Sequence, residues 1–80
     1  MSTPTYQTEI REFLETFIAE DDFDDSDDIF EMGLVSSLMA MQLVLFVEKR
    51  LDTKLDGADL DFANFRTIDR IATLMQAKAA

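Results

Sequence analysis

The sequence predicts an all-α fold, a small four-helix bundle with a long first loop and a short third helix. Three observations support this class. Apolar residues recur at helical spacing in several segments, no segment alternates as a strand does, and polar, turn-rich stretches separate the segments. Because 80 residues allow only one small hydrophobic core, we expect a single domain over residues 1–80.

Composition excludes most catalytic chemistry. The chain has 7 Lys+Arg, 17 Asp+Glu, no Cys and no His, and its net charge is −10. Without these two residue types there is no disulfide, thiolate, imidazole base or usual zinc or haem site. The negative charge argues against nucleic acid and anionic membranes as partners. We therefore expect a monomer that is not an enzyme and holds no metal. We also expect it to be cytoplasmic, because no apolar stretch is long enough to span a bilayer and the start does not resemble a signal peptide.

The first predicted helix runs from about Pro4 to Ala19. Its apolar residues recur at i, i+3, i+4, i+7 and i+8, which places them on one face: Ile10, Phe13, Leu14, Phe17 and Ile18. Thr3 followed by Pro4 is typical of a helix N-cap and first helical position. We interpret this segment as an amphipathic core helix.

The segment Glu20–Glu31 holds eight acidic residues and no base, which predicts a long loop. Its apolar residues are expected to hold it to the core: Phe23, Ile29 and Phe30. A calcium loop starting at Asp22 is the alternative, because oxygen ligands fall at Asp24 and Ser26. However, Asp27 stands where an EF-hand needs Gly, and Gly33 where it needs Glu. We therefore favour a solvated loop, and an acidic, calcium-responsive adaptor remains the alternative of a different class.

A second helix is predicted from Ser36 or Ser37 to Leu51. On a helical wheel, the residues expected in the core cluster together: Ala40, Leu43, Val44, Val47 and Leu51. The opposite stripe mixes apolar with polar residues: Leu38, Met41, Gln42, Leu45, Glu48 and Lys49. An exposed apolar patch on a small domain often marks a binding surface. The alternative is that another helix covers it.

The remaining chain predicts a turn-rich connection over Asp52–Gly57, followed by a short helix over residues 58–64. In this short helix we expect Leu60 and either Phe62 or Phe65 to face inward. Thr67 is then the expected N-cap of a last helix, with Lys78 near its C-terminal end. The apolar face of that helix comprises Ile68, Ile71, Ala72 and Met75.

The segment Gly33-Leu-Val-Ser-Ser-Leu38 places a serine at a helix start, directly after a glycine turn. Unpaired N–H groups and the helix dipole at such a position stabilise a phosphate ester by about 0.3–1 kcal/mol. From the residues alone, we favour the simpler interpretation that Ser36 and Ser37 only cap the helix.

These residues resemble the acyl or peptidyl carrier protein family. The resemblance extends from about Ile10 to Met75 and rests on three motifs. The first is Phe30-Glu-Met-Gly33-Leu-Val-Ser-Ser37-Leu38, and the second is a helix that ends with Val47-Glu48-Lys-Arg-Leu51. The third is Asp61-Phe-Ala-Asn-Phe65-Arg-Thr67-Ile68. It implies that Ser37 carries a 4′-phosphopantetheine arm, whose thiol holds an acyl group as a thioester. It further implies that partners dock on the outward residues of the second helix: Leu38, Met41, Gln42, Leu45 and Glu48.

Two departures from the family pattern are informative. Ser36 replaces the usual Asp before the modified serine, which leaves Ser36 as an alternative attachment site and leaves the matching transferase open. Gln42 and Lys49 stand where acidic residues are common in the second helix. We therefore expect partners to recognise this helix more through apolar contact than through charge.

The implied partners are a phosphopantetheinyl transferase, an acyl-loading enzyme, and a downstream synthase, ligase or acyltransferase. The subfamily resembles freestanding carriers of polyketide-type specialised metabolism, such as antibiotic biosynthesis, which hold glyceryl, hydroxymalonyl or methoxymalonyl units. An aminoacyl or peptidyl carrier of a nonribosomal or D-alanine-type pathway is the alternative. We favour a freestanding protein over an excised module.

Overall fold

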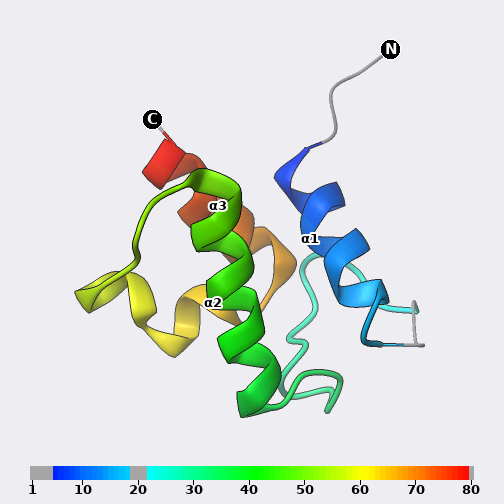
Figure 1. Ribbon diagram of the computed structural model, residues 1–80. Coiled ribbons are helices and arrows are strands. Elements are labelled where there is room, and N and C mark those ends of the chain that lie inside the picture. The colour runs from blue at the N-terminus through cyan, green and yellow to red at the C-terminus, as the bar shows by residue number, and fades with distance from the viewer. Residues whose placement is uncertain (1–4, 19–21, 80) are drawn as a thin grey trace.

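The computed structural model describes residues 5–18 and 22–79. It contains three α-helices, α1 (Tyr6–Glu15), α2 (Ser37–Leu51) and α3 (Ile68–Ala79), and two short 3-10 turns, η1 (Gly57–Leu60) and η2 (Phe62–Phe65), between α2 and α3 (Figure 1). Within the described ranges there is no strand, and the predicted all-α class is confirmed. None of the helices described is long and apolar enough to cross a membrane.

Helix α1 begins and ends inside the predicted limits. The Thr5 hydroxyl accepts the N–H of Thr8 at 3.1 Å, so the observed N-cap is Thr5, and the predicted cap at Thr3 lies outside the described residues. At the other end the Thr16 hydroxyl donates to the carbonyl of Phe13 at 2.6 Å and competes with further helical bonding. The helix therefore ends at Glu15, and Phe17 is 53% exposed, which corrects its predicted core position.

Helix α2 has the predicted bounds. Ser36 is its N-cap, and Asp52 ends it in the left-handed conformation (φ 52°). Leu43 and Val47 are fully buried. The other predicted core residues are partly buried at the flanks of this face: Ala40, Val44 and Leu51.

The predicted short helix over 58–64 is wrong as a continuous element. Asp61 has an extended backbone (φ −61°, ψ 130°), and its carboxylate accepts the N–H of Ala63 at 2.9 Å, which starts a new turn. Because Asp61 interrupts the helical path, the residues on either side of it do not share one face. Phe65 is buried as expected, but Leu60 and Phe62 are each 48% exposed.

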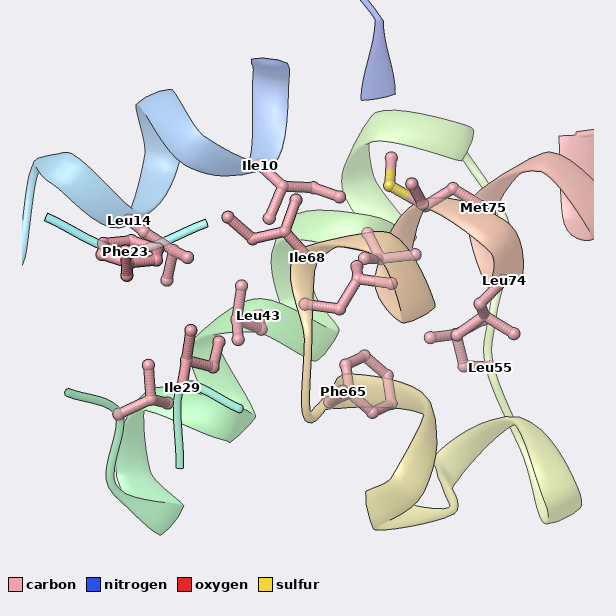
Figure 2. Close-up of a cluster of buried hydrophobic side chains, with 14 residues drawn as sticks. Ile10, Leu14, Phe23, Ile29, Leu43, Leu55, Phe65, Ile68, Leu74 and Met75 are labelled. Carbon is pink, nitrogen blue, oxygen red and sulfur yellow. The ribbon is translucent and has the colours of Figure 1, made fainter. Parts of the chain in front are cut away.

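Helix α3 forms the centre of the core. The Thr67 hydroxyl accepts the N–H of Arg70 at 2.9 Å, which confirms the predicted cap. The buried side of α3 comprises Ile68, Ile71, Ala72, Leu74 and Met75. Figure 2 shows Ile10 and Leu14 of α1, Leu43 of α2 and Phe65 of η2 converging on the residues of α3.

The acidic loop is held to the helices by specific bonds as well as by its apolar residues. Phe23 and Ile29 are buried, and Phe30 packs against the core, as predicted. Arg11 of α1 donates to the carbonyl of Phe23 at 2.9 Å and to the carboxylate of Asp25 at 2.7 Å. In addition, the N–H of Ile29 donates to the carbonyl of Arg66 at 2.9 Å. These bonds fix the loop that leads to the start of α2.

Candidate functional site

The chain reverses sharply just before α2. Gly33 has a φ of +79°, in the left-handed region that glycine adopts at low cost. Its N–H donates to the carbonyl of Phe30 at 3.0 Å, while the N–H groups of Leu34 and Val35 both donate to Ile29. Val35 is buried, so the segment that enters α2 is held by hydrogen bonds and by packing.

Two adjacent serines at the start of α2 have different environments. Ser36 Oγ accepts the N–H of Met39 at 3.4 Å, and so caps the helix. Ser37 is the first helical residue and is exposed, and within the described residues its hydroxyl makes no hydrogen bond. Both serines are exposed, and their hydroxyls differ in that Ser36 Oγ is engaged as the cap of α2 whereas Ser37 Oγ is not.

The positive end of α2 is not neutralised by a carboxylate. Its first turn contains no acidic residue, and its cap is the neutral Ser36 hydroxyl. The carbonyl of Ser36 accepts the N–H of Ala40, and its hydroxyl accepts the N–H of Met39. The N–H groups of Ser37 and Leu38 have no acceptor in the described part of the chain. Free N–H groups and the helix dipole favour an anion at this position.

A hollow of about 290 Å³ opens next to Ser37, between α2 and the two 3-10 turns. Its lining combines residues of α2 with residues of η1 and η2: Ser37, Ala40, Met41, Val44, Leu60, Phe62 and Phe65. Apart from the Ser37 hydroxyl, every lining side chain is apolar. An arm attached to Ser37 would begin at this hollow, whose walls suit methyl and methylene groups.

The acidic loop positions one wall of the hollow. The ring of Phe62 lies 4.3 Å from that of Phe30, and 5.8 Å from the guanidinium of Arg66. Arg66 Nε donates in turn to Asp28 Oδ2 at 2.7 Å. The N–H of Glu31 and the Arg66 guanidinium both stabilise the Asp28 carboxylate and lower its pKa. Sequence reasoning missed this network because it joins residues far apart in the chain.

The outward stripe of α2 is exposed as predicted. Leu38, Met41 and Leu45 are 73%, 61% and 53% exposed, and Gln42 is exposed beside them. No helix among residues 5–18 and 22–79 covers these three apolar side chains, so the alternative of a covering helix is wrong for the described chain. The stripe is a surface of the kind that partners use.

The charged residues of α2 all lie in its second half. Glu48 is half-buried, and its Oε2 accepts the N–H of Leu55 at 2.9 Å, which fixes the connection after the helix. Arg50 forms an ion pair with Glu9 of α1, and Lys49 is exposed. The sequence placed Glu48 on the outward stripe but gave no sign of its bond to the backbone.

The carboxylates of the acidic loop are directed to different partners. Asp25 binds Arg11, Asp28 binds Arg66, and Asp27 accepts the N–H of Asp24 at 2.8 Å. In the described part of the loop and elsewhere in the described chain, no three acidic residues are grouped so that they could hold a metal ion. The calcium alternative therefore has no geometric support in these residues.

Comparison with known proteins assigns the family. Residues 7–75 match the family model described as "Phosphopantetheine attachment site". The chain belongs to this family. It is 32% identical over 72 residues to the D-alanyl carrier protein of Lactococcus lactis subsp. cremoris (strain MG1363), an alignment that covers 88% of this chain and 91% of that protein. The D-alanyl carrier protein of Lactococcus lactis subsp. lactis (strain IL1403) matches with the same identity and coverage. No solved structure matches the chain.

Membership in the phosphopantetheine attachment family confirms the cofactor class. The domain implies a 4′-phosphopantetheine attached covalently to a serine. Carrier proteins of this kind are generally not catalysts, and they act together with a phosphopantetheinyl transferase and other enzymes. The exposed serine, the free amides of α2 and the apolar hollow fit such a group.

Proposed function

We propose that Ser37 carries the 4′-phosphopantetheine arm, and that the chain presents an acyl group to partner enzymes as a thioester on that arm. The observation that carries this proposal is the difference between the two serines. Both residues are exposed, but Ser36 Oγ accepts a hydrogen bond as the cap of α2, whereas Ser37 lines the hollow and its hydroxyl makes no hydrogen bond within the described chain. The family match adds that a serine of this domain is the attachment point.

Different residues around Ser37 would contact different parts of the arm. The bound arm supplies a thiol for thioester chemistry, which the Cys-free chain lacks. The N–H groups of Ser37 and Leu38 would favour the negative phosphodiester. Met41 and Phe62, on opposite walls of the hollow, would contact the apolar part of the arm.

For the cargo, we propose an aminoacyl group of the D-alanine type. Support comes from the relatives, which are D-alanyl carrier proteins and agree with the aminoacyl alternative better than with the polyketide interpretation. No relative supports the glyceryl, hydroxymalonyl or methoxymalonyl units. A D-alanyl group carries an ammonium, whose desolvation against apolar walls is costly, so its amino group would stay in solvent outside the hollow.

The docking face that we propose is formed by Leu38, Met41, Gln42 and Leu45. All four side chains are exposed, and Met41 also lines the hollow beside Ser37. A partner bound there would lie next to the attachment point. Glu48 borders this face, but because its carboxylate binds the N–H of Leu55, it shapes the face rather than attracting the partner.

Intact-mass analysis tests the attachment site. The wild-type chain and the Ser36→Ala and Ser37→Ala variants are each co-expressed with a broad-specificity phosphopantetheinyl transferase. Wild type and Ser36→Ala are expected to gain the mass of one arm, and Ser37→Ala is expected to gain none. A gain that persists in Ser37→Ala and disappears in Ser36→Ala would move the site to Ser36.

A second experiment tests the cargo. The arm-bearing chain is incubated with D-alanine, ATP and an enzyme that loads D-alanine onto the Lactococcus lactis carrier, and that carrier serves as the positive control. We expect a thioester-linked mass gain on wild type that hydroxylamine removes. If only the Lactococcus lactis carrier is charged, the D-alanine proposal is wrong while the attachment site still stands.

A further inference from the structure

The Asp28 carboxylate binds two separate parts of the chain with its two oxygens. Oδ1 accepts the N–H groups of Phe30 at 3.1 Å and of Glu31 at 3.0 Å, and so shapes the turn that leads to Ser37. Oδ2 accepts Arg66 Nε at 2.7 Å, in the segment that follows η2. This carboxylate therefore joins the turn before α2 to the segment that carries one wall of the hollow.

Arg66 is bonded to the same loop a second time, through its backbone. Its carbonyl accepts the N–H of Ile29 at 2.9 Å. The carbonyl of Ile29 in turn accepts the N–H groups of Leu34 and Val35, at 3.0 and 3.2 Å. Val35 directly precedes Ser36, the N-cap of α2. A continuous series of hydrogen bonds thus leads from Arg66 to the residue before the helix cap.

Aromatic contacts complete this arrangement on the side of the hollow. The Arg66 guanidinium lies 5.8 Å from the centre of the Phe62 ring, and the centre of that ring lies 4.3 Å from the centre of the Phe30 ring. Phe62 lines the hollow together with Ser37. These contacts and the bonds of Asp28 form a closed circuit, which connects the wall of the hollow to the turn before α2.

We propose that Asp28 and Arg66 are positioning residues for arm attachment, which set how the Ser37 hydroxyl and the Phe62 wall face each other. This inference rests on the proposed function and gives a role in it to two residues that do not line the hollow. During attachment the Ser37 oxygen bonds to a phosphorus of coenzyme A, the bond from that phosphorus to the ADP part breaks, and the hydroxyl proton is released. Because a displacement of about 1 Å at a reacting atom slows such a step severely, a shifted turn would reduce its rate.

The exposure of the ion pair separates this role from a purely structural one. The side chains of Arg66 and Asp28 are 45% and 24% exposed. Ion pairs that are exposed to solvent contribute little to the free energy of unfolding. Arg66→Gln is therefore expected to remain folded, so that its effect on arm attachment can be measured.

A second ion pair of the same loop provides a matched control. Arg11 binds Asp25 at 2.7 Å, and these side chains are 27% and 38% exposed. The pair has the same chemistry and a similar exposure, but it joins the loop to α1, and neither residue lines the hollow. Arg11→Gln therefore loosens the loop without acting on the turn before Ser37.

The test is steady-state loading of the arm-free full chain by a broad-specificity phosphopantetheinyl transferase with coenzyme A. We expect Arg66→Gln to lower kcat by about 5- to 10-fold and to leave the KM for the chain within about twofold, since the reacting oxygen is displaced but the docking face is unchanged. Arg11→Gln should leave both constants within about twofold of wild type. Arg66→Lys, which keeps the positive charge beside Asp28, is expected to recover part of the loss.

The partner variant Asp28→Asn tests whether the two residues act as a pair. Its amide oxygen can still accept the N–H groups of Phe30 and Glu31, but the ion pair with Arg66 is lost. The double variant with Arg66→Gln should be no slower than the slower single variant, because one interaction is removed in each case. Circular dichroism checks folding, and if Arg66→Gln does not fold, Asp28→Asn provides the same comparison with Arg11→Gln.

Backbone amide NMR spectra of the arm-free chain give a readout that does not depend on loading. Arg66→Gln is expected to shift the amide signals of Glu31 and Ser37, because both lie on the turn that the pair holds. Arg11→Gln should leave these two signals in place. Unchanged signals of Glu31 and Ser37 in Arg66→Gln would contradict the positioning role.

The kinetic outcomes distinguish this inference from the proposed function. If wild type is loaded and kcat is unchanged in Arg66→Gln, or falls equally in Arg66→Gln and Arg11→Gln, the inference is overturned and attachment to Ser37 still stands. A loss confined to KM would show that Arg66 contacts the transferase, and would also overturn the positioning role. Absence of loading of the wild-type chain contradicts the proposed function and the inference together.

Discussion

Arg66 Nε lies 2.7 Å from Asp28 Oδ2, and this pair joins the acidic loop to the segment that forms one wall of the hollow. The same guanidinium lies 5.8 Å from the ring of Phe62, which contacts Phe30 of the loop. The loop is therefore part of the architecture of the site, although three of its acidic residues, Asp22, Asp24 and Glu31, are exposed.

The Asp28 contacts predict a loss of stability in acid. The N–H of Glu31 and the Arg66 guanidinium lower the pKa of Asp28 in the folded chain, so its stabilising contribution is complete above the pKa of the unfolded state. That contribution is lost as the pH falls through the lower, folded-state pKa. We expect the melting temperature of the wild type to decrease as the pH is lowered below about 4. The melting temperature of Asp28→Asn should decrease less steeply over the same range. Asp24→Asn, at an exposed position in the same loop, is the control and should follow the wild-type curve.

A charge in the core should unfold the domain. Val47 is fully buried on α2, so Val47→Asp places a carboxylate among apolar neighbours. We expect a loss of more than about 3 kcal/mol in the free energy of unfolding. Leu45→Asp, two residues earlier on the same helix but 53% exposed, should remain folded. Urea denaturation followed by circular dichroism measures both, and equal losses would show that the assigned burial of α2 is wrong.

The two serines should differ in stability as well as in modification. Ser36→Ala removes the side chain that caps α2 and should cost about 0.5–2 kcal/mol. Ser37→Ala removes an exposed hydroxyl without a hydrogen bond in the described chain and should change the free energy of unfolding by less than about 0.5 kcal/mol. Chemical denaturation of the unmodified variants compares them. A larger loss for Ser37→Ala would assign the structural role to Ser37.

The turn before α2 depends on glycine because of its backbone conformation. A methyl group at Gly33 would meet no atom within 4 Å, so its φ of +79° is the reason for glycine. Gly33→Ala should cost about 1–2 kcal/mol through backbone strain alone. Gly33→Asn should cost less, because asparagine tolerates the left-handed region. If Ala and Asn are equally tolerated, the turn is not set by this φ.

Local signals predicted the parts of the fold that depend on local physics. The hydroxyl caps and the helical periodicity predicted the bounds of α2 and the start of α3. The helical wheel of α2 also predicted that Leu38 and Met41 are exposed. The position of Ser37 at the helix start came from the motif, because a helix has its free N–H groups at that end.

Side-chain hydrogen bonds, both local and non-local, decided what the apolar periodicity did not. The apolar spacing of Phe17 continues that of α1, but the Thr16 hydroxyl binds the backbone and the helix ends before it. Asp61 starts a second 3-10 turn by binding Ala63, and periodicity cannot detect this side-chain bond. The partners of Arg11 and Arg66 lie in a loop whose path is set by the fold, so these pairs were not predictable from spacing.

The neutral cap at Ser36 has a consequence for how α2 is completed. A carboxylate cap would supply the helix with its own negative charge, but here the N–H groups of Ser37 and Leu38 have no acceptor within the described chain. In the arm-bearing protein that we propose, a phosphodiester on Ser37 would place a negative charge at this end of the helix. The first turn of α2 would then be completed by a group that is added after translation, and the stability of this turn would depend on whether the arm is attached.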